Sequence, residues 1–142
     1  MITIYFHAIR EQPSKDRWAP MVTVSLSVPS KVAGEPIVVP NVVAMIDTGS
    51  DSCRIDDDLA SQYSIPVIGR STSYSMGNPI EVNVYRCSII FDRSAQLQAD
   101  LGGAQFQQQK NHFSLLLGMQ ALQFFDFSMS SAEQKAVLHW RD

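Results

Sequence analysis

A short acidic sequence, Asp47-Thr48-Gly49-Ser50, directly follows five apolar residues, Val42 to Ile46. A carboxylate at the end of a buried strand, at the start of a tight turn, is held in place, and neighbouring dipoles can change its proton affinity. Gly49 lets the backbone turn and lets a substrate approach, while Thr48 adds a hydroxyl on a stiff side chain. These residue types suit acid–base chemistry, with Asp47 as the candidate catalytic group.

The sequence lacks the patterns of several other catalytic classes. Ser50 lies in Gly49-Ser50-Asp51 rather than in the Gly-x-Ser-x-Gly pattern of a serine hydrolase, and no phosphate-binding loop occurs. The three histidines are scattered, and together with the two cysteines they lack the spacing of a zinc site. We therefore expect neither a metal nor another cofactor.

Composition narrows the class of protein further. A chain of 142 residues with 45% hydrophobic and 18% charged residues suits one globular domain with its own core. The net charge is -3 and no segment concentrates Lys and Arg, so nucleic acid is not an expected partner. The longest apolar runs are too short for a membrane span, and the N-terminus lacks the features of a signal peptide. We expect a soluble, cytoplasmic protein without a membrane partner.

The two cysteines, Cys53 and Cys87, are too few for a disulfide framework at this size. We expect reduced, partly buried thiols, which pair only if the fold brings them together. Asp56-Asp57-Asp58 is typical of a helix N-terminus or a solvated turn, where acidic residues are favoured.

The elements that would position Asp47 are short β-branched runs separated by Pro, Gly, Ser or Asn. Along residues 21–28 the alternation is strict, which places Val22, Val24, Leu26 and Val28 on one face of a strand. A turn then leads into a second predicted strand, residues 37–46. This hairpin would deliver the chain to Asp47. A further short strand is predicted over residues 3–6.

A second hairpin is predicted over residues 71–91, with Met76-Gly77-Asn78-Pro79 as its turn. The Gln-rich segment that follows, residues 96–111, is expected to be a solvated loop without a chemical role. It includes Gly102-Gly103.

The C-terminal part predicts a buried strand over residues 113–117 that ends at Gly118, followed by one or two helical turns over residues 119–124. Two more strands are predicted over residues 125–129 and 136–140. The pattern is that of an all-β fold with one short helix near the C-terminus.

Three of these features, in this order, resemble the retropepsin-like aspartic proteases, the single-domain relatives of pepsin. Asp47-Thr48-Gly49-Ser50 is similar to the active-site loop of the family, and the Met76-Gly77 hairpin lies where the family has its flap. Leu116-Leu117-Gly118 is similar to the pair of apolar residues and the glycine that precede the family's short helix. The likeness covers residues 20–142 and leaves residues 1–19 as an N-terminal extension. It implies a closed β-barrel or sandwich.

The resemblance also implies an activity, that of an aspartic endopeptidase acting on a peptide or protein substrate. Two aspartates would face one water and share one proton. The ionised acid takes a proton from the water while the protonated acid hydrogen-bonds the scissile carbonyl. The motif occurs only once in this chain. We therefore expect a two-fold homodimer in which each subunit contributes Asp47.

The neighbours of Asp47 acquire supporting roles by the same resemblance. Thr48 would send its hydroxyl across the dimer axis to the partner's loop, and Gly49 would expose backbone to the substrate. Ser50, where retroviral members usually have Ala, would hydrogen-bond the outer oxygen of Asp47 and favour an acidic optimum.

Asp51, Met76 and Gly77 would contact the substrate, with Ile80 among the apolar residues around it. Retroviral members place an Arg after the Leu-Leu-Gly element, where this chain has Met119, as bacterial and other cellular relatives often do. The competing interpretation is a catalytically idle module of the same fold that dimerises or binds peptides.

Overall fold

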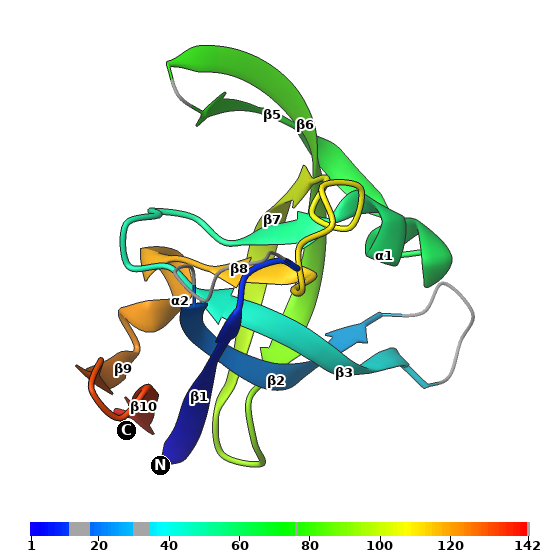
Figure 1. The fold of residues 1–142 in the computed structure, drawn as a ribbon. Helices are drawn as coiled ribbons and strands as arrows, with labels where there is room; N and C mark the ends of the chain where they lie inside the picture. Colours follow the sequence, from blue (N-terminus) through cyan, green and yellow to red (C-terminus); the bar gives the residue numbers. More distant parts are fainter. Residues whose placement is uncertain (12–17, 30–34, 76, 142) are drawn as a thin grey trace.

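The computed structural model describes residues 1–11, 18–29, 35–75 and 77–141 (Figure 1). Its strands and helices, in chain order, are β1 (Ile2–Ala8), β2 (Trp18–Val28), β3 (Ile37–Ile46), β4 (Arg54–Asp56), α1 (Asp57–Gln62), β5 (Val67–Ser75), β6 (Asn78–Ile90), β7 (Gln96–Ala104), β8 (Leu115–Leu117), α2 (Met119–Leu122), β9 (Phe125–Ser130) and β10 (Lys135–Trp140).

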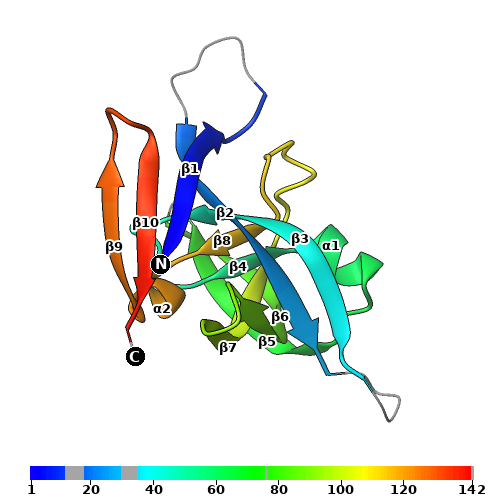
Figure 2. The same cartoon turned by 90° about the horizontal axis from the view of Figure 1, so that it is seen from below.

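A closed ring of strands forms the centre of the molecule. Its order is β2, β3, β8, β4, β7, β6, and β6 closes it by pairing back onto β2 at Ser25–Ser27. β5 extends from β6 as a hairpin, while β1, β10 and β9 continue the sheet from β2. Figure 2 shows β9 and β10 on one side of the molecule, next to β1. Closure pairs the backbone groups that open sheet edges would leave free. The expected closed all-β barrel is confirmed.

The predicted first hairpin is β2 paired antiparallel with β3. The four apolar residues predicted to share one face of β2 are all buried, and Leu26 and Val28 have no exposed surface. The register of the pair shifts between Val24 and Leu26, and Asn41 on β3 has a positive φ of 57°. Short polar side chains such as Asn tolerate this conformation. The core therefore begins at β2, and β3 runs from it to Asp47.

The Gln-rich segment contains a strand, so the prediction of a solvated loop over residues 96–111 was wrong for its first nine residues. β7 (Gln96–Ala104) pairs with β6 along its length and with β4. Gln96, Gln98 and Asp100 are exposed, whereas Ala99 and Leu101 are buried. The alternation of period two was present in the sequence, but Ala99 and Gly103 alternate with the two leucines and weaken the apolar signal, and the glutamines obscured it.

The acidic run forms the start of a helix, as expected. Asp56 is fully buried and caps α1, because its side chain accepts a hydrogen bond from Leu59 N at 3.0 Å. Its other oxygen accepts from Gln107 N at 3.0 Å. Among the described residues the chain thus has two short helices rather than the single C-terminal one predicted.

The N-terminal segment contributes a strand to the same sheet. β1 pairs with β2 on one side and with β10 on the other, and its Ile4 is buried in the core. β2 itself begins at Trp18. Neither helix in the part of the chain that the structure describes has the length and apolar character needed to cross a membrane.

Candidate functional site

Asp47 follows β3 directly and is positioned by a strand from much later in the chain. β8 lies between β3 and β4, parallel to the first and antiparallel to the second. The last paired residues are Ile46 and Leu117, and the amide of Asp47 donates to the Leu117 carbonyl at 2.9 Å. Two neighbouring strand ends therefore hold the backbone of this carboxylate.

The turn after Asp47 fixes the side chain as well. The amide of Gly49 donates to Asp47 Oδ1 at 3.0 Å, and the amide of Ser50 donates to the Asp47 carbonyl at 3.2 Å. Asp47 is half-buried, while Thr48 and Gly49 are exposed. The carboxylate is thus oriented by its own turn and still accessible from outside.

The N-terminus of α2 is hydrogen-bonded to the loop that follows Asp47. The amides of Met119 and Gln120 donate to the carbonyls of Ser50 (2.7 Å) and Asp51 (2.9 Å), and the Gln120 side chain accepts from the Cys53 amide at 3.0 Å. These bonds require the start of α2 to approach the loop backbone very closely. The residue directly before α2 is a glycine.

Gly118 is that glycine, and a side chain there has no room. A Cβ atom would overlap the carbonyl oxygen of Ser52 and lie 2.5 Å from the carbonyl oxygen of Ser50. Its φ of -96° is ordinary, so the requirement is for space rather than for an unusual conformation. This explains why a glycine follows the apolar pair at residues 116–117.

The hydroxyl of Ser50 does not make the predicted bond. It donates to the carbonyl of Ser52 at 2.8 Å instead of to the carboxylate of Asp47. Both partners of this bond belong to the loop, so Ser50 stabilises the loop. The hydrogen bond to Asp47 Oδ1 comes from Gly49 instead.

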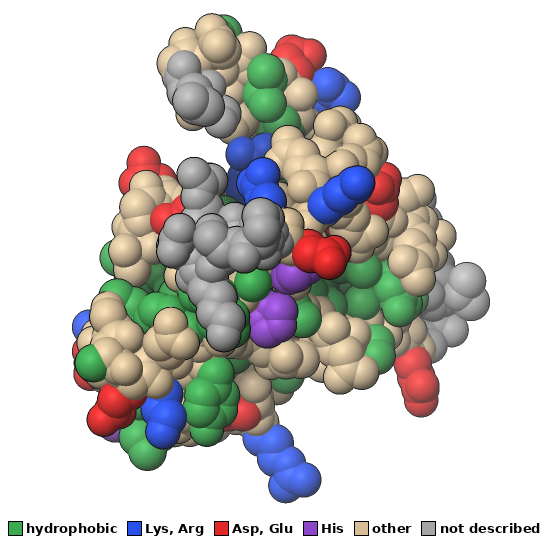
Figure 3. All heavy atoms as spheres, viewed as in Figure 1, with side chains coloured by type: hydrophobic (Ala, Val, Ile, Leu, Met, Phe, Trp, Pro, Cys, Tyr) green, Lys and Arg blue, Asp and Glu red, His purple; other side chains and the backbone are tan. Residues whose placement is uncertain are grey.

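A cleft of about 620 Å³ lies between this loop and the β5–β6 hairpin. The loop contributes residues 49–54, the hairpin contributes residues 71–74, 82 and 84, and β7 contributes Asp100 and Gly102. In Figure 3 the molecule is hollowed beneath the hairpin, with basic side chains at the inner end of the hollow. Most of the lining residues are polar, so the cleft presents hydrogen-bonding groups more than apolar surface.

The remaining predicted site residues have four different outcomes. Asp51 lines the cleft. Gly77 lies at the hairpin tip with a positive φ of 82°, away from the lining, and Met76 lies outside the described residues. Ile80 was expected near the substrate but lines a different hollow, on the side of the hairpin that faces residues 103–109.

Sequence reasoning missed the most prominent charged residue of the cleft, Arg54 at the start of β4. Its guanidinium donates to Ser73 Oγ on the hairpin at 3.0 Å and to the Gly103 carbonyl on β7 at 2.6 Å. The signal that could have found it is Gly102-Gly103. Cβ atoms there would meet the side chains of Arg54 (3.2 Å from Nε) and Asp57.

Both cysteines are buried and unpaired, as expected of reduced thiols. Burial raises the pKa of the Cys87 thiol to about 12, with a smaller contribution from the neighbouring Cys53. Burial also raises the pKa of Cys53, against hydrogen bonds from the Gly118 and Ala121 backbone. Within the described ranges no group of three or more His, Cys, Asp or Glu side chains is placed to hold a metal ion.

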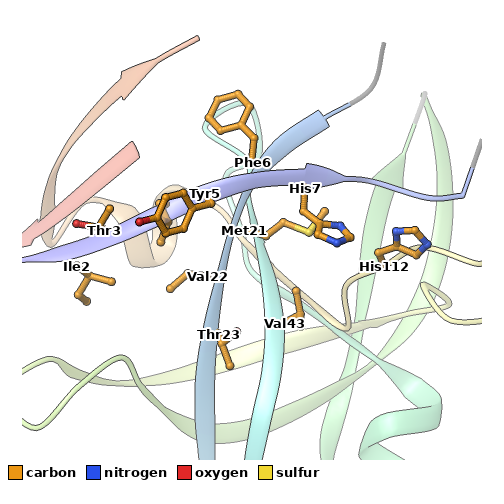
Figure 4. Close-up of a pocket in the computed structure, with 11 residues that line it drawn as sticks. Ile2, Thr3, Tyr5, Phe6, His7, Met21, Val22, Thr23, Val43 and His112 are labelled. Carbon is orange, nitrogen blue, oxygen red and sulfur yellow. The ribbon is translucent and has the colours of Figure 1, made fainter. Parts of the chain in front are cut away.

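A second hollow, of about 460 Å³, lies over β1, β2 and β3 (Figure 4). His7 and His112 lie at one end of it, where the Nδ1 atoms of both rings donate to the Ala8 carbonyl at 3.0 and 3.1 Å. Its lining is largely apolar and includes no carboxylate. The titratable side chains of this hollow are thus the two histidines and Tyr5, and they lie apart from the Asp47 loop.

Comparison with known proteins supports this fold. No protein-family model and no curated protein sequence matches the chain. Among solved structures it is similar to a retropepsin-like aspartic protease from Rickettsia conorii, with 14% sequence identity and a TM-score of 0.55. The likeness covers 96% of this chain and 88% of the other. At this identity it concerns the arrangement of strands, and the chain has an all-β, retropepsin-like fold with short helices.

Proposed function

We propose that the protein is an aspartic endopeptidase that acts as a homodimer, with Asp47 of each subunit activating one shared water. The observation that carries the proposal is the oriented, accessible carboxylate of Asp47. It accepts a hydrogen bond from Gly49 N at 3.0 Å, and the lining of the polar cleft begins at Gly49, two residues after Asp47. A carboxylate held in this way loses little freedom when it binds a water molecule.

Two copies are needed because peptide hydrolysis by carboxylates takes two of them. One ionised acid accepts a proton from the water as the water oxygen attacks the peptide carbonyl. The second acid, protonated, donates to the carbonyl oxygen, and a proton then passes to the departing amine as the C–N bond breaks. Two carboxylates this close share one proton, which supplies both forms at once.

The surface around the loop suits contact with a second copy. Thr48 is exposed, and among the described residues its hydroxyl makes no hydrogen bond, so it is available to a partner loop. Met119 and Phe124, at and just after α2, are each 41% exposed. Apolar side chains beside a polar site are typical of the core of a subunit interface.

The β5–β6 hairpin would act as the flap of this peptidase. It extends away from the barrel above the loop in Figure 1, and residues 71–74 of it line the cleft. A peptide lying between loop and hairpin would be shielded from bulk water, and hairpins of this kind can open and close as substrates enter and leave.

The test is cleavage of a denatured protein across the acidic pH range, with purified protein and the variant Asp47→Asn. We expect the variant to lose at least about a hundredfold in rate, since its amide cannot accept the proton. The matched control is Asp58→Asn, an exposed aspartate on α1, on the other side of the molecule in Figure 1. It should retain activity.

Equal cleavage by the wild-type protein and Asp47→Asn would refute the proposal. Analytical ultracentrifugation gives the oligomeric state, and a pepstatin-type inhibitor, whose hydroxyl stands in for the attacking water, should bind the dimer. A dimer that binds peptides but cleaves none would favour the idle module instead.

A further inference from the structure

Arg54 is the cationic side chain closest in sequence to the proposed catalytic loop, seven residues after Asp47. It is the first residue of β4, and it lines the cleft together with the loop residues 49–53. A peptide whose scissile bond lies at Asp47 and whose chain continues through the cleft must therefore pass the Arg54 side chain.

The guanidinium has spare hydrogen-bonding capacity. Arginine carries five N–H donors, and the structure gives Arg54 two acceptors, Ser73 Oγ and the Gly103 carbonyl. Its Nε is buried and has no hydrogen-bond partner among the described residues. Both acceptors are neutral, so the positive charge is oriented but not compensated by them.

The acidic side chains around Arg54 leave it without an ion pair. No carboxylate in the described ranges lies within ion-pair distance of Arg54. Asp57, the nearest by its electrostatic effect, accepts a hydrogen bond from the Tyr85 hydroxyl at 2.8 Å. Asp100, which also lines the cleft, accepts hydrogen bonds from Nε and Nη2 of Arg86 at 2.8 and 3.2 Å.

Burial lowers the pKa of the Arg54 guanidinium, an effect that attraction to Asp57 opposes, although arginine remains charged. A half-buried cation that has lost hydration and has gained no ion pair is stabilised when a carboxylate reaches it. The planar guanidinium favours a carboxylate over other acceptors, because two parallel N–H donors match its two oxygens.

Resting on the proposed peptidase function, we infer that Arg54 selects substrates that carry a carboxylate side chain, Glu or Asp, close to the scissile bond. A neutral amide of the same shape would accept one hydrogen bond but would leave the cation unpaired. The substrate selectivity of this cleft would thus differ from that of a cleft that binds only apolar side chains.

The experiment uses peptides with an apolar pair at the cut and either Glu or Gln at one neighbouring position at a time. At about pH 5.5 a Glu side chain is ionised. At one position we expect kcat/KM to be about tenfold higher for Glu than for Gln, the range of one charge-assisted hydrogen bond. In Arg54→Gln this ratio should fall to about one, and in Arg54→Lys it should be intermediate.

A structural role of Arg54 would give a different pattern. Ser73→Ala removes the hairpin contact and leaves the cation, so it should keep the preference for Glu even if overall activity changes. Equal rates for Glu and Gln at every position in the wild-type protein, or an undiminished ratio in Arg54→Gln, would overturn the inference.

The same peptides separate this inference from the peptidase proposal. If no peptide is cleaved, the proposed activity fails. The dissociation constants of the Glu and Gln peptides for the wild-type protein then test whether Arg54 selects a carboxylate. A dissociation constant about tenfold lower for a Glu peptide, lost in Arg54→Gln, would still support the selectivity. Equal binding of both peptides, or binding of neither, would refute it.

Discussion

Replacing Gly118 by alanine tests the close contact between α2 and the loop that follows Asp47. The added Cβ would overlap the Ser52 carbonyl oxygen and lie 2.5 Å from the Ser50 carbonyl oxygen and 2.9 Å from the Ser52 carbonyl carbon. All three are backbone atoms, so no flexible side chain can move aside. Overpacking of this kind costs about 1–3 kcal/mol.

The displaced loop would lose hydrogen bonds as well. Met119 N to the Ser50 carbonyl, at 2.7 Å, is the first that the shift would stretch, and its loss adds about 1 kcal/mol. We therefore expect Gly118→Ala to lower the free energy of unfolding by about 3 kcal/mol. Asp47 moves with the loop, so activity in the proposed assay should fall at the same time.

Urea unfolding at a fixed protein concentration measures this change, because a dimer makes the midpoint depend on concentration. The matched control is Gly69→Ala on β5, where a Cβ meets nothing within 4 Å. It should change stability by less than about 1 kcal/mol. If Gly118→Ala were as stable as the control, the loop would have room that the structure does not show, and the proposed reason for this glycine would fail.

Two further perturbations test the buried polar groups. Asp56→Ala should destabilise by about 3 kcal/mol in urea unfolding, because it removes the cap of α1 and leaves the amides of Leu59 and Gln107 unpaired; a loss below about 1 kcal/mol would contradict this. Cys87 has its pKa raised to about 12, so above its ordinary value of 9.0 the unfolded chain releases a proton that the folded chain keeps. Stability should therefore fall as the pH rises from 9 towards 12, and Cys87→Ala should make that fall less steep; an identical slope in the variant would show that the thiol is not involved.

The parts of the fold that the sequence predicts well are those with one dominant local cause. Strict alternation on β2 predicts which face is buried, and the acidic run at residues 56–58 marks the start of α1. Gly118 marks the start of α2. Each depends on neighbours within a few residues, which is the range over which periodicity and capping operate.

Long-range packing decides the features that the sequence did not predict. β7 has an alternating pattern hidden by glutamines, and it becomes a strand because β6 and β4 supply partners on both sides. The role of Arg54 depends on Ser73 and Gly103, which come from the hairpin and from β7. No local pattern around Arg54 indicates that these three residues meet.

The loop after Asp47 also combines features set by local sequence with features set by long-range packing. That Asp47 ends a buried strand could be predicted from the preceding apolar residues, and the structure agrees. The hydrogen bond of the Ser50 hydroxyl could not be predicted from the sequence. Whether this hydroxyl donates to Asp47 or to the Ser52 carbonyl depends on how tightly the turn closes. Gly118, which is distant in sequence, contributes to how tightly the turn closes, because it leaves room for the carbonyls of Ser50 and Ser52.

The position of β8 between β3 and β4 has a consequence for the order of folding. Ala44 pairs with Leu115, and the amide of Asp47 donates to the carbonyl of Leu117. The pairing of β3 with β8 closes a long loop, and the entropy of closing it is lost before the new contacts stabilise the chain, so this step is slow. A chain still emerging from the ribosome would therefore carry an unsupported Asp47 turn until residue 117 is released. The active site of the proposed peptidase would therefore form only after residue 117 has been synthesised.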